Sequence, residues 1–154
     1  MSSHTALIRW QHDGGSFAKR QYSRTHTWTF DGGVTVPASP APTSVPFPYS
    51  DPAHVDPEEA FVAAISSCHL LTFLFVAAKE GFEITSYEDN AVGHMTPNDA
   101  GVPWVSTVEL SPRIVYVDGK APSAEQEAEL HHRAHHECYI ANSVRTEITV
   151  NGSR

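Results

Sequence analysis

The most apolar stretch of the chain covers residues 57–79, and it carries helix signals at both ends. Asp56 can act as an N-cap and Pro57 suits the first helical position. Glu59, three residues after Asp56, completes a capping box. Gly81 provides a natural stop at the other end. The pattern therefore predicts one long helix whose apolar residues are buried in the centre of the molecule.

Alternating apolar and polar positions predict strands on both sides of this helix. The turn signal "DGG" at 31–33 lies within one of them, and "GVPW" at 101–104 lies in the turn between two others. The predicted strands are residues 4–12, 26–36, 82–95, 102–117 and 143–150.

A second helix is predicted in "APSAEQEAELHHRAHHEC", residues 121–138, where Ser123 and Gln126 fit another capping box. Between the first strands and the first helix, residues 37–57 hold seven of the eleven prolines. Proline removes backbone donors, so this segment is expected to be an extended loop. A loop this long in a compact domain is usually functional or lies across a partner.

These elements predict an α+β fold with β-rich flanks around two helices, and each helix carries one of the two cysteines. Cys68 falls inside the first helix and Cys138 at the end of the second. The 154 residues suit a single domain, 1–154, and are enough to form a core.

Charge narrows the range of partners. Ten Lys and Arg residues against eighteen Asp and Glu give a formal net charge of −8. Nucleic acids and anionic membrane surfaces attract clustered positive charge, so neither is expected as a partner.

Two further observations bear on location. The N-terminus lacks the pattern of a secretory signal, and a cytoplasmic location is expected. Residues 60–78 are about long enough to span a membrane. They contain several polar side chains and have no basic flank, which favours a buried central helix.

Two readings of the cysteines follow from the residues alone. Free cysteines are often buried as small apolar groups, so Cys68 and Cys138 can simply be core residues. In a reducing compartment, a cysteine pair is more often catalytic, redox-sensing or metal-binding. His69 adjoins Cys68, but neighbours on a helix point about 100° apart. We therefore expect His69 to pack or hydrogen-bond elsewhere rather than act as a base for the thiol.

Three segments, in order along the chain, resemble the OsmC/Ohr family of thiol peroxidases. "DPEEAFVAAISSCHLLTFL" is similar to the family's first-cysteine motif, and "ECYIANSVRTEITV" to its second-cysteine segment, although Tyr139 stands where proline is usual. "YSRTHTW" resembles the segment with the active-site arginine. The resemblance implies an intertwined homodimer in which curved antiparallel sheets wrap two central helices and the active sites lie at the subunit interface.

The resemblance also implies roles for individual residues. Cys68 would be the peroxidatic cysteine and Cys138 the resolving cysteine. Arg24, with Arg20 as the fallback, would be the active-site arginine, and Glu58 the active-site glutamate. The implied substrates are organic hydroperoxides and the implied reductant is a dithiol or lipoyl protein, with no cofactor.

The chemistry of these residue types is consistent with such roles. A thiolate, not a thiol, cleaves a peroxide bond, and a buried thiolate needs a cation nearby. Arginine supplies the charge and a fork of donors. The sulfenic acid left on the first cysteine condenses with the second thiol to a disulfide.

The spacing of Glu58 and Cys68 poses a geometric question. Ten residues of straight helix separate their backbones by about 15 Å. Either the helix breaks near Ser66 and Ser67, or the site combines residues from two subunits.

Two alternatives remain open at this stage. The run "HHRAHHEC" places His131 with His135, and His132 with His136, at the i,i+4 spacing of zinc ligands, with Glu137 or Cys138 as a third ligand. The other alternative is a family member without peroxidase activity that binds a small apolar ligand.

Overall fold

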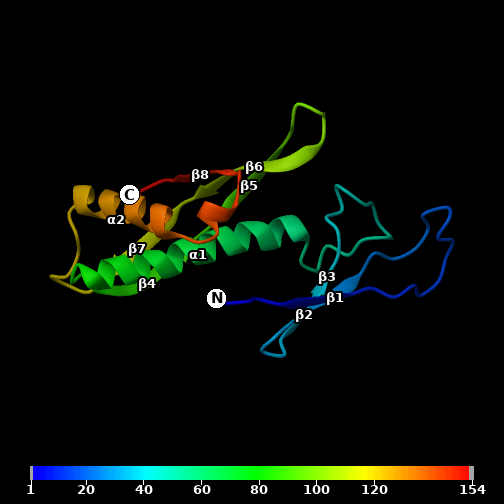
Figure 1. The fold of residues 1–154 in the computed structure, drawn as a ribbon, viewed down its shortest axis with the longest axis horizontal. Helices are drawn as coiled ribbons and strands as arrows, with labels where there is room; N and C mark the ends of the chain where they lie inside the picture. Colours follow the sequence, from blue (N-terminus) through cyan, green and yellow to red (C-terminus); the bar gives the residue numbers. More distant parts are fainter. Residues whose placement is uncertain (1, 153–154) are drawn as a thin grey trace. The chain divides into compact units, whose positions relative to one another are not determined.

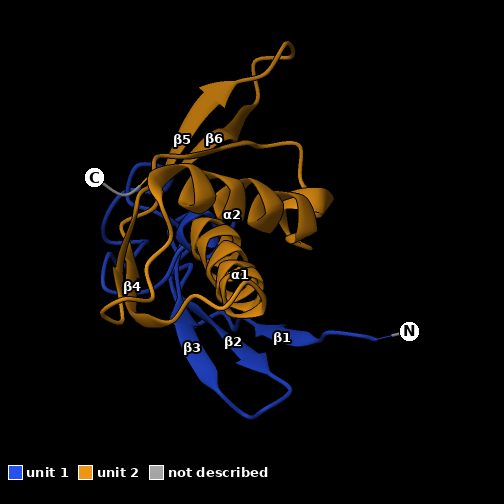
Figure 2. Ribbon diagram, turned by 90° about the vertical axis from the view of Figure 1, so that its left-hand side faces the viewer, with its two compact units in different colours: residues 1–60 blue, residues 61–154 orange. Residues whose placement is uncertain are grey.

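The computed structural model describes residues 2–152, and the chain divides after Ala60 into two compact units. Figure 2 colours the first unit blue and the second orange. The first unit ends just after the start of the long helix α1, and the second contains the rest of that helix and everything that follows it. That all 154 residues form one domain stays a prediction.

The first unit contains a three-stranded antiparallel sheet in the order β1-β2-β3 (Figure 1). The strands are β1 (Ala6–Arg9), β2 (His26–Phe30) and β3 (Thr35–Ala38). The strand predicted over 26–36 is therefore a hairpin, and the predicted turn at 31–33 separates its two arms. Pro37 is tolerated because β3 is an edge strand, where a missing backbone donor costs no ladder bond.

The proline-rich segment forms the predicted loop. Residues 39–56, all of them described, contain no helix or strand. The loop folds back on the end of β3, because Ser39 N–H donates to Val55 O (3.0 Å) and Val55 N–H donates to Pro37 O (3.1 Å). The buried Ser39 hydroxyl also accepts a hydrogen bond from Asp51 N–H (2.8 Å).

Helix α1 (Pro57–Lys79) begins and ends as the sequence predicts. Asp56 Oδ1 accepts from Glu59 N–H (2.7 Å), and Asp56 N–H donates to Glu59 Oε2 (3.3 Å), which completes the capping box. Gly81 has φ +85° in a C-terminal cap where Phe82 N–H donates to Ala77 O (3.0 Å). The helix runs without a break, so the break considered near Ser66 and Ser67 does not occur.

Burial of α1 is confirmed for one face only. The buried residues are Ile65, His69, Phe73, Val76 and Ala77. On the remaining surface, Leu71 and Phe75 are each 64% exposed. By length and composition alone α1 could cross a membrane, and 28% of its most apolar window is buried within the chain.

The two strands predicted between the helices are each divided in two. The observed strands are β4 (Ile84–Asp89), β5 (Val92–Pro97), β6 (Pro103–Leu110) and β7 (Pro112–Tyr116). β4 pairs antiparallel with β7 and β5 antiparallel with β6, so each predicted strand passes from one sheet to another. Asp89, at the end of β4, accepts a hydrogen bond through Oδ1 from the N–H of Ser111, which lies between β6 and β7 (2.7 Å). This bond joins the two crossing points, where the chain passes from one sheet to the other.

Helix α2 (Ala124–Glu137) has the predicted capping box between Ser123 and Gln126. A short 3-10 turn, η1 (Ala141–Ser143), and strand β8 (Glu147–Val150) follow. β8 is shorter than the predicted strand and pairs parallel with β6.

Two apolar clusters position the helices in the second unit. Helix α2 packs on the C-terminal half of α1 through a buried cluster that β4 and β7 cover: Phe73, Val76, Ala77, Leu130 and Ala134. The N-terminal half of α1 packs on β6 through Ile65, Val108 and Leu110. Figure 1 shows α2 next to the C-terminal half of α1, and Figure 2 shows the two helices crossing at an angle. The end of α2 comes to the middle of α1, where Cys138 meets Cys68.

Candidate active site: a cysteine pair and an arginine-lined pocket

The two cysteines meet where the end of α2 reaches α1. Cys68 lies in the middle of α1, and Cys138 is the C-cap of α2. Their sulfur atoms are 2.7 Å apart and both thiols are free. Cys138 is 1% exposed, whereas Cys68 is half-buried. The structure thus brings the two predicted cysteines together within one chain.

Hydrogen bonds distinguish the two sulfurs. The Cys138 thiol donates to Cys68 Sγ, and the backbone N–H of Ile140 donates to the same sulfur (3.5 Å). Burial, followed by the hydrogen bond to Cys68, raises the pKa of Cys138 to about 11. Cys138 therefore stays protonated at neutral pH and acts as a donor, while Cys68 is the acceptor. Donors aimed at a sulfur favour its anionic form.

His69 is part of the core between the helices. Its Nε2 shares a hydrogen bond with Nδ1 of His131 (3.1 Å), and the two rings are stacked at 5.4 Å. Burial, with His131 and His135 nearby, lowers the pKa of His69 to about 4, and burial lowers the pKa of His131 as well. Both rings are uncharged at neutral pH. The prediction that His69 packs and hydrogen-bonds is confirmed.

The histidine run on α2 does not form a multidentate site. His131 turns inward to His69, so it does not pair with His135 on one helix face. His132 and His136 approach each other outside, with their Nε2 atoms 3.2 Å apart. In residues 2–152, no group of three His, Cys, Asp or Glu side chains is placed to hold a metal ion. Cys138, one of the two candidate third ligands beside Glu137, faces Cys68 instead.

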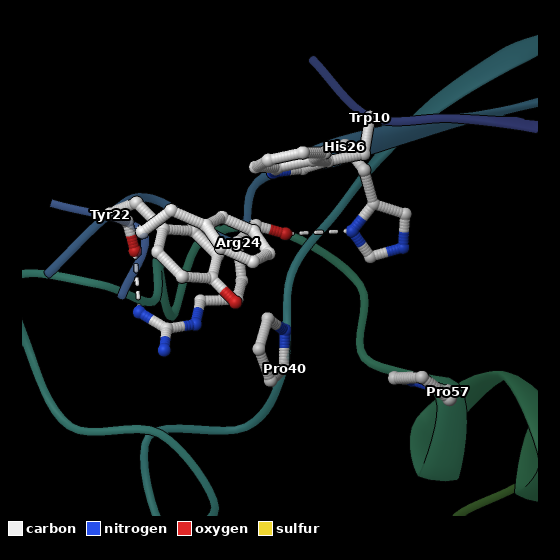
Figure 3. A pocket seen from close by; sticks show the side chains of 7 residues that line it. Trp10, Tyr22, Arg24, His26, Pro40 and Pro57 are labelled. Atoms are coloured by element: carbon white, nitrogen blue, oxygen red, sulfur yellow. Dashed lines mark hydrogen bonds between the residues drawn. The ribbon is translucent and has the colours of Figure 1, made fainter. Parts of the chain in front are cut away.

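Arg24 belongs to the first unit, where main-chain carbonyls and aromatic rings hold it. Its Nη1 donates to Tyr22 O (2.5 Å) and Arg20 O (2.8 Å), and its guanidinium lies 3.9 Å above the Tyr22 ring and 5.4 Å from the Tyr49 ring. Figure 3 shows the bond to Tyr22. Arg20 is exposed with φ +59°, and its carbonyl serves to hold Arg24. These contacts favour Arg24 over Arg20 as the positioned guanidinium.

Arg24 lines a cavity of about 510 Å³ within the first unit (Figure 3). The cavity wall is mostly aromatic rings and prolines: Trp10, Phe17, Tyr22, Arg24, His26, Pro40 and Pro57. Phe17 and Tyr22 are stacked at 4.6 Å, and Trp10 Nε1–H donates to Ser23 O (2.9 Å), so the rings are fixed. The sequence pattern did not predict this pocket, although Trp10, Phe17 and Tyr22, three large aromatic residues close together in the chain, were a signal for it.

Glu58 lies half-buried in the first turn of α1, directly after Pro57, which lines the pocket. Within the described part of the chain, no ion pair joins Arg24 to Glu58 or to another carboxylate. The role of Glu58 stays a prediction.

A polar contact close to Cys68 on α1 was also not predictable from the sequence. Ser66 Oγ donates to Asp89 Oδ2 (2.5 Å), and the same carboxylate receives the Ser111 amide. Asp89 thereby ties α1 to both crossing points of the strands. No local pattern marks a contact across 23 residues.

A comparison with family models places these features in context. The model described as OsmC-like protein matches residues 50–152, which include both cysteines. The chain belongs to the OsmC-like protein family. The family resemblance found in the motifs is thereby confirmed.

Solved structures extend this OsmC-like assignment to the whole chain. The protein is similar to an OsmC-like protein of unknown function from Vibrio cholerae, with 49% identity and a TM-score of 0.94 over 98% of this chain and 99% of that one. More distant structures share the fold. One is an organic hydroperoxide resistance protein OsmC from Legionella pneumophila, with 14% identity and a TM-score of 0.74 over 100% and 98% of the two chains. Another is the organic hydroperoxide resistance protein OhrB of Bacillus subtilis, with 19% identity and a TM-score of 0.63 over 97% of each chain.

These matches confirm the predicted α+β class and the OsmC-like fold. No curated protein matches the chain.

Proposed function

We propose that this OsmC-like protein is a cysteine-based peroxidase that reduces organic hydroperoxides. The observation that carries the proposal is the cysteine pair, with Cys138 as a protonated donor 2.7 Å from Cys68. Family membership supports it, and so does the similarity in fold to organic hydroperoxide resistance proteins.

The proposed reaction has two steps on the protein. The Cys68 thiolate attacks the terminal oxygen of the hydroperoxide and breaks the O–O bond; the alkoxide takes up a proton and leaves as the alcohol, and Cys68 becomes a sulfenic acid. The Cys138 thiol then attacks the Cys68 sulfur, and water leaves as the disulfide forms. An external dithiol or lipoyl protein reduces the disulfide by exchange.

Arg24 is the proposed cation for the thiolate and for the peroxide oxygens. Its Nη1 donates to two carbonyls, whereas its Nε and Nη2 have no hydrogen-bond partner among residues 2–152. Those two nitrogens keep donors for a ligand in the aromatic pocket. The apolar wall of this pocket favours an organic hydroperoxide over hydrogen peroxide.

The proposed assembly is a homodimer. The uninterrupted helix α1 separates the backbones of Glu58 and Cys68 by about 15 Å, so one arginine cannot contact both in the same chain. The site is therefore proposed to combine residues from two copies. The apolar face of α1 that carries Leu71 and Phe75 is uncovered in the single chain, and a second copy would cover it.

The location proposed for the enzyme is the cytoplasm, where thiol donors keep the cysteine pair reducible.

The decisive experiment measures peroxide consumption by the reduced protein. With dithiothreitol or a lipoyl protein as donor, turnover of an alkyl or aryl hydroperoxide should exceed that of hydrogen peroxide. Cys68→Ser should abolish turnover. Reduced wild-type protein that consumes no hydroperoxide with either donor would exclude the enzyme.

The second candidate is a binding protein without peroxidase activity. The pocket of the first unit supports it, because aromatic rings and one guanidinium can hold a small apolar ligand without any redox step. In that case an apolar ligand should quench Trp10 fluorescence while hydroperoxides remain unreduced. The same peroxide assay therefore separates the two candidates.

A further inference from the structure

The chain segment after α2 wraps around the two sulfur atoms. We name residues 138–143 the sulfur-binding turn. Within it, Ile140 N–H donates to Cys68 Sγ (3.5 Å) and Ala141 N–H donates to Cys138 Sγ (3.4 Å). One short segment thus supplies a backbone donor to each sulfur.

Side chains hold the carbonyls of this turn. Asn142 Nδ2 donates both to His136 O (2.8 Å) and to Cys138 O (2.9 Å). The Asn142 backbone N–H also donates to Cys138 O (3.1 Å). Ser143 Oγ donates to Tyr139 O (2.7 Å).

These bonds are needed because α2 ends at the cysteine itself. Cys138 has φ −70° and ψ 119°, so the chain leaves the helical path there. The last carbonyls of a helix have no partner within the helix. Asn142 supplies partners for two of the carbonyls at this end and fixes the direction in which the chain departs. Asn142 is itself exposed, so these contacts do not result from burial of the side chain.

We propose that Asn142 is a positioning residue that holds the sulfur-binding turn so that its Ile140 amide, with the Cys138 thiol, stabilises the anionic sulfur of Cys68. Asn142 touches neither sulfur and acts on Cys68 through the amide of Ile140, while the Ala141 amide holds the sulfur of the donor Cys138. The donors come from the same chain as Cys68. The inference rests on the proposed function only in naming Cys68 as the nucleophile.

Thiol alkylation tests this inference without any peroxide. The reduced protein is treated with iodoacetamide at pH values from 5 to 10, and mass spectrometry follows the modification of Cys68 and Cys138 separately. Asn142→Ala should alkylate Cys68 about tenfold more slowly at neutral pH, because the rate follows the thiolate fraction. The midpoint of the rate against pH should rise by about one unit, since a tenfold loss of thiolate corresponds to one pH unit. Asn142→Ser, which keeps one donor, should be intermediate.

Asn98→Ala is the matched control. Asn98 is also exposed, and its Oδ1 accepts two backbone hydrogen bonds, from Ala100 and Val102 in the β5–β6 turn. Its replacement therefore also removes two side-chain bonds to the main chain, but in a turn that does not contact the sulfurs. This variant should alkylate like the wild type.

Two results would overturn the inference. One is an Asn142→Ala profile that matches Asn98→Ala. The other is faster alkylation of both cysteines, which indicates a turn that has merely loosened. If Asn142→Ala slows Cys68 alkylation and the wild-type protein has no peroxidase activity, the positioning role is supported and the proposed enzyme is rejected. If Asn142→Ala keeps normal peroxidase activity and alkylates like the wild type, the proposed enzyme is supported and the positioning role is rejected.

Discussion

The imidazole rings of His69 on α1 and His131 on α2 lie nearly parallel, at 12°, with a 3.1 Å contact between Nε2 and Nδ1. The outer nitrogen of His131, Nε2, is buried and has no hydrogen-bond partner among the described residues. Phe73 packs against the His131 ring at 4.3 Å. A proton added to this pair therefore places a charge in the apolar contact between the helices.

This pair predicts a loss of stability in mild acid. The pKa of His69 is about 4 in the folded protein against 6.5 as the ordinary value, so the folded state binds fewer protons between these limits. The contribution of uncharged His69 to the stability of the fold is complete above about pH 6.5 and is lost as the pH falls towards 4. A shift of this size corresponds to roughly 3 kcal/mol. The lowered pKa of His131 acts in the same direction, although Glu127 and Asp89 oppose it.

Urea unfolding between pH 7.5 and 4 measures this loss. In His69→Gln the free energy of unfolding should fall less between pH 7.5 and 4, because the amide can still bond to His131 but does not titrate in this range. His132→Gln, on the exposed side of the same helix, should keep the wild-type slope. Parallel slopes for all three proteins would show that the pair does not govern acid stability.

The order of the two thiols leads to a trapping prediction. Cys138→Ser should consume about one equivalent of alkyl hydroperoxide and stop as a sulfenic acid on Cys68, because no second thiol is present to resolve it. A dimedone-type probe and mass spectrometry locate the product. Wild-type protein given one equivalent should instead form a Cys68–Cys138 disulfide within one chain, since the sulfurs already lie 2.7 Å apart. Label on Cys138, or a crosslink between two chains, would reverse or reject the assignment.

Replacing Arg24 should slow hydroperoxide reduction far more than replacing Arg20. Arg24→Ala is expected to slow hydroperoxide reduction by about a hundredfold, the usual cost of removing a positioned donor from a developing anion. Arg24→Lys should recover only part of the rate, because lysine keeps the charge and loses the fork of donors. Arg20→Ala should change little, because Arg20 contacts Arg24 only through its main-chain carbonyl. Steady-state rates of the Arg24 and Arg20 variants with one alkyl hydroperoxide test this prediction. Equal losses of rate in the two alanine variants would show that Arg24 is not the cation for the thiolate.

Glu58→Gln provides a graded comparison with Arg24→Ala in the same assay. A glutamate that only orients the arginine should cost less than the arginine itself. A loss as large as that of Arg24→Ala would indicate that Glu58 touches the reacting atoms.

The exposed face of α1 predicts the oligomeric state. Light scattering at micromolar concentration should give twice the 16.9 kDa chain mass. Leu71→Lys with Phe75→Lys should shift the protein to the monomer, because both side chains are 64% exposed in the single chain and would face a second copy. Val102→Lys, at another exposed apolar position (56%), serves as the control and should leave the mass unchanged. A 16.9 kDa wild-type particle would contradict the dimer.

The sequence by itself determined the two helices and the place of each cysteine on them. The capping boxes at Asp56 and Ser123 and the stop at Gly81 involve residues a few positions apart, so their energetics are local. The strands were only partly predictable. Alternation marked their positions, but the breaks near Asp89 and Ser111 depend on which sheet each half joins.

Only the tertiary structure decided which side chains meet. Cys68 and Cys138 are 70 residues apart, and His69 and His131 are 62 apart. Local periodicity could not show that His131 turns into the core while His132, the next residue, stays outside. It also could not show that two carbonyls and an aromatic ring hold the guanidinium of Arg24. Contacts of this kind depend on how helices and loops pack, and packing is set by the whole chain rather than by any one segment.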